Sequence, residues 1–431
     1  MELLCNKGII MLVQFTFENF RSVRDTVTFS MVSGLHNQHS VLQARNYSLL
    51  PSAVIYGANA SGKSNILRAL DYMKAMVLNS RKVFQSTDTL SHEPFRLSTE
   101  TINASSSFEV IFFNRQIKYR YGFEADSTTV YSEWLFADEK GKEAKLFFRD
   151  CDSGEFYVNP EKFREGKGLK VLPNSLFIWK CDQEGGEISG SILEWFKNLN
   201  LLNGMRPSDY LMFTLNQMKN PEFYEEIKKL VTAADFGIND LRIQEDRFSL
   251  VLPENIPLPP DISAKILQEA SSPLIKVGIK TVHAKFDNDG SQSGFEEFEL
   301  GTDESEGTKK YFCLSAPFID TLRNGKVLLV DELDASLHPL LTMALISLFN
   351  NPEINTRNAQ LIFASHDTNL LNQKLFHKSQ IWFTEKDSAG STHLHSLVEY
   401  KNVRATDNLE KHYIQGKYGA IPYIGRFPAG K

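Results

Sequence analysis

The stretch Gly57-Ala-Asn-Ala-Ser-Gly-Lys63-Ser64 has the spacing of a phosphate-binding loop. In such a loop glycines let backbone amides face the phosphates, the lysine reaches the outer phosphates and the serine hydroxyl binds Mg²⁺. A short apolar strand, Ser52–Tyr56, precedes the stretch, and an amphipathic helical run begins at Asn65. This order points the positive end of the helix at the phosphates. A chance glycine-rich turn, the alternative, would not require both flanking elements.

We therefore predict that this loop binds a nucleotide together with Mg²⁺. Ser64 is a predicted ligand of the metal as well as a contact of the phosphates. The predicted contacts to the nucleotide within the loop and the helix start are Gly57, Asn59, Gly62, Lys63, Ser64 and Asn65.

An apolar strand that ends in two acids, Lys326–Glu332, supplies the second half of the predicted site. Asp331 can complete the Mg²⁺ shell beside Ser64, and Glu332 can polarise a water for attack on the γ-phosphate. Open α/β sheets bind ligands at the carboxyl ends of their strands, where these acids lie. The alternative is a solvated strand end.

Two further features fit the same site, although each has an ordinary structural explanation. The apolar strand beginning at Gln360 runs into His366, which could contact the γ-phosphate, whereas a lone histidine is more often structural. Ser305 and Gly307 precede a helical run and could form an anion site, although Ser-x-Gly-Thr is usually only a helix cap.

Composition restricts the class of protein without identifying it. The 431 residues suggest two or three domains, or one large domain with an insertion, and the net charge of −6 gives no overall attraction to nucleic acid. Four widely spaced cysteines favour a reducing compartment. No apolar run approaches the ~20 residues of a membrane span. We expect a cytoplasmic protein without membrane contact, with Met11 as a candidate start.

Hydrophobic periodicity predicts three parts along the chain. Residues 11–150 contain a hairpin, the phosphate loop and an antiparallel β meander between 107 and 149. Residues 151–270 are predicted to be a mainly helical insertion, with helical periodicity between 188 and 235. Residues 271–431 contain further strands and the acidic and histidine motifs.

Taken in order, these motifs resemble a known family. The ABC-type ATPase heads of the SMC, RecF and OLD clade share this order, and within the clade the chain most resembles the RloA and abortive-infection proteins of bacterial phage-defence loci, often labelled AAA-family ATPases. The motifs that carry the resemblance are ENFRS (Glu18–Ser22), GANASGKS, ESEGT (304–308), VDELDASLHP (Val330–Pro339), ASHD (Ala364–Asp367), and also Ala234–Ile238 and Tyr413–Pro422.

The resemblance implies an α/β, ABC-type P-loop ATPase head with a β meander and a helical insertion, which hydrolyses ATP with Mg²⁺. It implies a homodimer or higher homo-oligomer in which Ser305 and Gly307 of one subunit touch the γ-phosphate held by another. Asp334–His338 would cross that interface, Glu332 would be the catalytic base and His366 the switch histidine. The family's glutamine-loop residue is not obvious, because Gln85 lies in polar loop sequence.

Two functions remain open on the sequence. The defence-family likeness, and the short segment after His366, favour a regulatory ATPase that senses infection and controls a separately encoded nuclease or toxin. The alternative is a RecF-like DNA-binding ATPase of DNA repair. Arg115, Lys118 and Arg120 interleave with aromatic residues and could contact nucleic acid, or they could form a solvated hairpin face.

Overall fold

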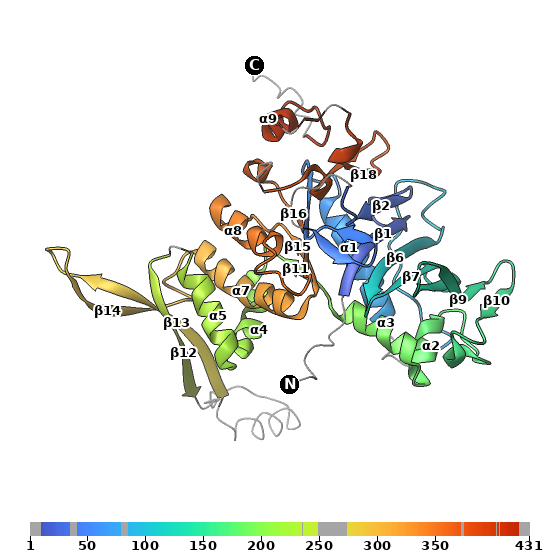
Figure 1. Cartoon of the computed structure of the whole chain (residues 1–431), viewed down its shortest axis with the longest axis horizontal. Helices are drawn as coiled ribbons and strands as arrows, with labels where there is room; N and C mark the ends of the chain where they lie inside the picture. The colour runs from blue at the N-terminus through green and yellow to red at the C-terminus, as the bar shows by residue number, and fades with distance from the viewer. Residues whose placement is uncertain are drawn as a thin grey trace, which may run out of the picture. The chain divides into compact units, whose positions relative to one another are not determined.

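The computed structural model divides the chain into two compact units. The larger unit contains Met1–Met205 and Asp320–Lys431, and the smaller unit contains Arg206–Ile319 (Figure 1). The residues that the structure describes are 10–34, 41–78, 85–234, 236–248, 274–371, 375–401, 403–404 and 406–421.

A six-stranded sheet in the larger unit carries the phosphate loop. Its spatial order is β11 (Leu199–Asn203), β15 (Val327–Asp331), β16 (Gln360–Ala364), β5 (Ser52–Gly57), β17 (Ile381–Lys386) and β18 (Thr392–Ser396). The strands from β11 to β17 are parallel, whereas β18 runs antiparallel to β17. β5, β15 and β16 are buried along their whole length, which explains their continuous apolar sequences.

The second sheet of the larger unit is antiparallel and contains the predicted hairpin and meander. Its order is β10 (Glu155–Val158), β9 (Glu143–Asp150), β8 (Val130–Asp138), β7 (Ile117–Ala125), β6 (Ser106–Asn114), β1 (Ile10–Glu18) and β2 (Val27–Ser30). A small separate hairpin consists of β3 (Leu42–Ala44) and β4 (Tyr47–Leu49). The structure thus confirms the mixed α/β class and the antiparallel meander that the sequence predicted.

Helix α1 (Lys63–Leu78) follows the phosphate loop, and its apolar side chains join the core that contains residues of both sheets. The buried amide of Gln360 also links the sheets, because it donates to Leu12 O at 3.1 Å and accepts from Leu12 N at 2.6 Å. The other helices of this unit are α2 (Phe177–Gln183), α3 (Glu187–Lys197), α8 (Pro339–Asn350) and α9 (Leu409–Ile414). Among the described residues, no helix combines the length and apolar composition that a membrane span requires.

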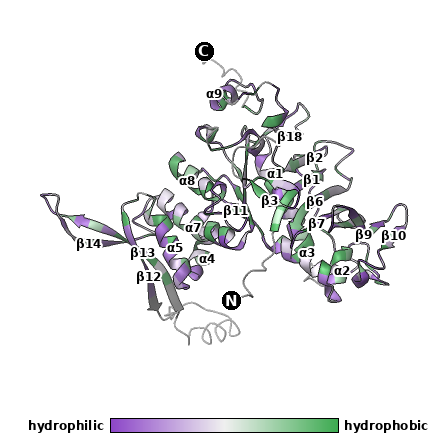
Figure 2. Ribbon diagram, viewed as in Figure 1, coloured by the Kyte–Doolittle hydropathy of each residue, from purple (hydrophilic) through white to green (hydrophobic). Residues whose placement is uncertain are grey.

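The smaller unit pairs helices with a three-stranded antiparallel sheet. Its elements are α4 (Leu211–Gln217), α5 (Pro221–Thr232), β12 (Ile238–Phe248), β13 (Leu274–Phe286) and β14 (Gln292–Glu299), and α7 (Glu306–Asn324) begins in it. Asn220 caps α5 through its side chain, which accepts from Glu222 N at 2.9 Å. β14 is almost wholly exposed and its ribbon is coloured largely hydrophilic (Figure 2).

The division into units differs from the boundaries that the sequence suggests. The helices α2 and α3 fall in the predicted insertion 151–270 but belong to the larger unit, and β13 and β14 lie beyond that insertion but belong to the smaller one. The segment predicted to be mainly helical also contains one strand that the sequence did not indicate, β11, which pairs with β15 and joins the parallel sheet. Residues 249–270 of the predicted insertion lie outside the described residues.

Candidate functional site

The phosphate loop connects β5 to α1 as the sequence predicts. Gly62 has φ +108°, in the left-handed region that favours glycine, and Ala60 also has a positive φ. The Lys63 ammonium is folded back onto the loop, where it donates to Gly57 O at 2.8 Å and to Ala58 O at 3.1 Å. Burial lowers the pKa of Lys63 to about 8, although the Asp331 charge acts in the opposite direction.

The two predicted Mg²⁺ ligands lie together. The Ser64 hydroxyl donates to Asp331 Oδ1 at 2.9 Å, which brings the helix start and the end of β15 into direct contact. Asp331 is buried. A hydroxyl and a carboxylate at this spacing are oxygen ligands of the kind that Mg²⁺ prefers. The residues present therefore fit the metal that the sequence predicts.

Glu332 follows directly and has φ +55°, a left-handed backbone conformation that is uncommon for a residue other than glycine. β15 ends at Asp331, and after the turn at Glu332 the Leu333 N–H donates to Ala364 O, 3.3 Å away at the end of β16. Sparsely populated backbone conformations of this kind are concentrated at functional sites. The role of Glu332 as a base stays a prediction.

His366 and the loop after Glu332 are joined at the end of β16. The backbone N–H of His366 donates to Asp334 Oδ2 at 3.1 Å. The second carboxylate oxygen of Asp334 is buried without a hydrogen-bond partner among the described residues. Partial burial and then the Lys63 charge lower the pKa of His366, which favours the neutral imidazole. An unpaired buried carboxylate oxygen is an acceptor that a ligand or metal-bound water could satisfy.

The strand order explains why these residues converge. β15, β16 and β5 are adjacent and parallel, so the acids, the histidine and the phosphate loop all follow carboxyl ends at one edge of the sheet. The Tyr56 hydroxyl adds a link across that edge, because it donates to Asp367 O at 3.1 Å. Tyr56 immediately precedes Gly57, and Asp367 immediately follows His366.

The remaining predicted contacts lie in different surroundings. Asn59 is exposed at the loop tip. Asn65 turns its side chain to Ser22, donating to Ser22 Oγ at 2.7 Å. Gln85, the glutamine-loop candidate, is exposed and its carbonyl accepts from Asn174 at 2.8 Å, which is an ordinary loop contact.

Ser305 and Gly307 belong to the smaller unit, at the start of α7. Ser305 Oγ accepts from Thr308 N at 3.1 Å and lies 2.8 Å from Thr308 Oγ1, so it caps the helix. The side chain is nevertheless exposed, and Gly307 is partly exposed. The cap is thus compatible with a surface that meets another subunit.

A pocket of about 680 Å³ opens beside Asn65. Its lining combines basic side chains with apolar ones and includes Arg21, Ser22, Asn65, Arg96, Leu97 and Lys386. Sequence reasoning gave Arg21 and Ser22 no role, although both lie in the ENFRS motif. Arg21 pairs with Glu93 at 2.6 Å, and this ion pair stands at the pocket wall.

Gly204 is a further residue that sequence reasoning missed. It follows β11, and its backbone N–H donates to Asp331 O at 2.7 Å. A Cβ placed on it would lie 2.1 Å from the carbonyl oxygen of Glu332. The close approach of this loop to the end of β15 therefore requires glycine.

Replacing Gly204 by alanine is expected to push the Asp331–Glu332 peptide out of position. We expect the free energy of unfolding to fall by about 2 kcal/mol, the usual cost of overpacking, and ATP turnover to fall with it. Urea unfolding and a phosphate-release assay would measure the two effects. Gly34→Ala, at a glycine with nothing within 4 Å of the added carbon, is the matched control. Equal stability of Gly204→Ala and wild type would contradict the close approach.

A family model described as "AAA domain, putative AbiEii toxin, Type IV TA system" matches residues 52–372. No curated protein gives a significant sequence match. Similar solved structures include an SMC head bound to the C-terminal winged-helix domain of ScpA, which is 12% identical with a TM-score of 0.45 over 90% of this chain and 99% of that chain.

Two further similar structures are also 12% identical to this chain. The SMC head domain from Thermotoga maritima gives a TM-score of 0.40 over 89% of this chain and 98% of that chain. The recombination mediator protein RecF gives a TM-score of 0.34 over 91% of this chain and 100% of that chain. The family match spans most of the chain and contains the phosphate loop, the acidic strand and the histidine strand. The chain therefore belongs to the AAA-domain family described as "AAA domain, putative AbiEii toxin, Type IV TA system".

Proposed function

We propose that this protein is a cytoplasmic regulatory ATPase that closes as a homodimer around ATP and controls a separate effector. The observation that carries the ATPase assignment is the hydrogen bond from Ser64 to Asp331, which joins the phosphate loop to the acidic strand. The Lys63 ammonium, Glu332 with its left-handed backbone, and His366 follow strands that end at the same edge of the parallel sheet.

In this proposal each residue has one task. Lys63 exchanges its two loop carbonyls for phosphate oxygens, and the loop amides supply the remaining contacts. Ser64 and Asp331 would hold Mg²⁺, which when bound neutralises charge on the phosphates. Glu332 accepts a proton from the attacking water, and a neutral His366 is available to donate a hydrogen bond at the γ-phosphate.

The pocket beside Asn65 offers room for the nucleoside. Asn65 follows Ser64 at the start of α1, so the pocket lies next to the phosphate end of the site. Exposed Leu97 provides apolar area for a base, and Arg96 and Lys386 provide donors for the ribose and phosphates.

The dimer is proposed because the residues that match the signature motif lie outside the unit that carries the phosphate loop. Ser305 and Gly307 lie in the smaller unit, at an exposed helix start whose amides suit an anion. Supplied by a second copy of the chain, they would complete the γ-phosphate site. Closure and opening of the dimer would then depend on the nucleotide.

The regulatory role is supported by the family description, which names a toxin and a toxin–antitoxin system. A separately encoded nuclease or toxin is the effector that we propose. Co-purification of the protein with the product of the adjacent gene, with and without ATP, tests this role directly. Binding that depends on ATP is expected.

The RecF-like alternative requires a surface that attracts nucleic acid. The candidate basic residues in the β6–β7 turn and on β7 already have acidic partners: Arg115 pairs with Glu194 at 3.0 Å, Arg120 with Glu143 at 2.7 Å and Lys118 with Asp138 at 3.7 Å. This arrangement favours the solvated hairpin face over a nucleic-acid strip. Tight ATP-dependent binding to plain duplex DNA would instead support the alternative.

Glu332→Gln separates ATP binding from ATP hydrolysis. The variant keeps Lys63, Ser64 and Asp331, so Mg·ATP should still bind with near wild-type affinity, while turnover should fall at least 100-fold, roughly the contribution of a general base. Trapped ATP should shift the protein to a dimer in gel filtration. Normal turnover, without such a shift, would show that Glu332 is not the base.

A further inference from the structure

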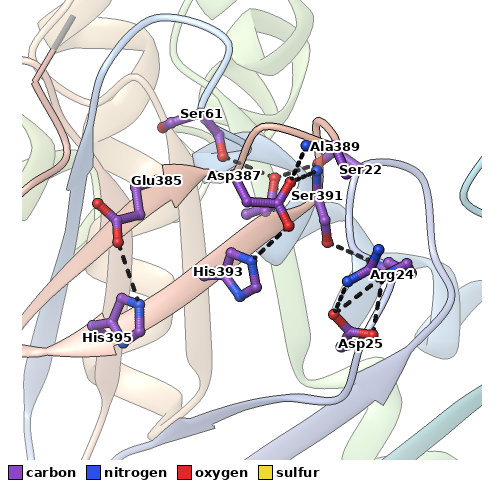
Figure 3. Close-up of polar contacts among 11 residues, drawn as sticks. Ser22, Arg24, Asp25, Ser61, Glu385, Asp387, Ala389, Ser391, His393 and His395 are labelled. Atoms are coloured by element: carbon purple, nitrogen blue, oxygen red, sulfur yellow. Dashed lines mark hydrogen bonds and ion pairs between the residues drawn. The ribbon is translucent and has the colours of Figure 1, made fainter. Parts of the chain in front are cut away.

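The β17–β18 hairpin lies against the phosphate loop and against the turn that carries Ser22. β17 pairs with β5 in parallel, from Ile381 opposite Val54 to Thr384 opposite Gly57. Figure 3 shows Ser61 of the loop and Ser22 near the connection that contains Asp387 and Ser391. The phosphate loop, the turn that carries Ser22 and the β17–β18 connection, which are distant in sequence, therefore lie in contact with one another.

Thr392, the first residue of β18, makes the central contacts. Its hydroxyl donates to Ser61 O at 2.8 Å and lies 2.8 Å from Ser22 Oγ. Its backbone N–H donates to Ser22 O at 2.7 Å. The side chain is 1% exposed, so water cannot easily replace these partners.

The contacts continue through Ser22 to the start of α1. Asn65 Nδ2 donates to Ser22 Oγ, so one hydrogen-bonded chain runs from Asn65 through Ser22 and Thr392 to Ser61. The chain brackets Gly62, and a Cβ on Gly62 would lie 2.2 Å from Thr392 Oγ1. Hydrogen bonds thus hold the loop on both sides of Gly62, at Ser61 and at Asn65.

The connection between β17 and β18 is itself ordered by Asp387. Its carboxylate accepts from Ala389 N at 2.9 Å and Ser391 N at 2.8 Å, and lies 3.2 Å from His393 Nε2 (Figure 3). Ser391 Oγ accepts from Arg24 N at 3.2 Å. These bonds hold the connection, and with it Thr392, beside the phosphate loop.

We infer that Thr392 is a positioning residue of the nucleotide site, which acts with Ser22 to hold the phosphate loop in its binding shape. The inference rests on the proposed ATP-binding function. A phosphate loop binds through backbone amides, whose directions depend on the loop conformation. A loop ordered before binding loses less entropy on binding, so affinity depends on the residues that order it.

The test compares two substitutions of Thr392. Thr392→Val keeps the shape but removes the hydroxyl, and we expect the Kd for Mg·ATP in calorimetry to rise about tenfold, the usual effect of losing one buried hydrogen bond. Thr392→Ser restores the hydroxyl and is expected to restore affinity to within about twofold. In turnover assays the effect should appear in KM, with kcat nearly unchanged, because the reacting groups are untouched.

Thr342→Val is the matched control. Thr342 is fully buried on α8, and its hydroxyl has no hydrogen-bond partner among the described residues. The same substitution there should leave the Kd unchanged. Ser22→Ala removes the shared contact from the other side, and combined with Thr392→Val it should add much less than its separate effect, because both break one chain.

The outcomes distinguish the two proposals. ATP binding by wild type with equal affinity in Thr392→Val and Ser22→Ala would overturn the positioning role and leave the ATPase assignment intact. A Thr392→Ser protein as weak as Thr392→Val would also overturn it, since the hydroxyl would not be the cause. Failure of wild type to bind ATP would remove both the assignment and the inference.

Discussion

Lys63→Ala is expected to abolish measurable ATP binding. The ammonium is the only side-chain cation within the loop, and hydrogen bonds from a charged donor to phosphate are about twice as strong as neutral ones. We expect an affinity loss of more than about 100-fold, because a desolvated cation and its charge-assisted bonds are removed together. Titration calorimetry with Mg·ATP would measure it.

The control must account for the structural role of Lys63. Its side chain is 5% exposed and donates to the loop carbonyls of Gly57 and Ala58, so its loss frees two acceptors. Thermal unfolding of the variant should therefore be recorded beside the calorimetry. Lys145→Ala, on β9 in the meander, removes a lysine distant in sequence from the loop and should bind ATP normally. Retained affinity in a folded Lys63→Ala protein would contradict the assigned site.

Ser305→Arg is expected to block hydrolysis while leaving nucleotide binding intact. If Ser305 acts on the phosphate held by another subunit, a bulky side chain there should prevent closure of the dimer, because tight interfaces do not accept added volume. The phosphate loop of the same subunit is unchanged, so the monomer should bind ATP as wild type does. Turnover measured beside calorimetry would show both results.

Mixing two inactive variants tests whether the site is shared. A hybrid dimer of Lys63→Ala and Ser305→Arg subunits has one intact composite site, made from the loop of the second subunit and the signature of the first. Random pairing makes half of the dimers hybrid, each with one of two sites, so recovery of up to about a quarter of wild-type activity is expected.

Ser293→Arg, at an exposed position of β14, is the control for an added charge in the same unit. It should hydrolyse ATP normally. Wild-type turnover by Ser305→Arg alone would show that Ser305 is no more than the helix cap that its bond to Thr308 describes.

The sequence predicted those parts of the site that depend on one local pattern. A glycine-rich turn before a helix and two acids after an apolar strand are local signals, and the structure brings Ser64 and Asp331 together. The meander was predictable for the same reason, because alternation of apolar and polar residues marks each strand by itself.

Residues whose role depends on distant partners were not predictable. Thr392 is a threonine in a short strand, and only the folded sheet places it against Ser61 and Ser22. Gly204 shows no turn signature, since what excludes a side chain there is the carbonyl of Glu332. β11 was missed because its five residues, which lie between two segments with helical periodicity, are too few to show the alternation that marks a strand.

The position of β5 has a consequence for how the protein is made. β5 pairs on one side with β16 and on the other with β17, and 323 residues of chain separate Ser61 from its partner Thr384. During translation, β5 is therefore synthesised long before β16 and β17, the two strands that pair with it. Open strand edges and late long-range pairing favour slow folding and aggregation. A chain released before β17 could pair β5 with β16 but would leave the other edge of β5 unpaired and open to association with other chains.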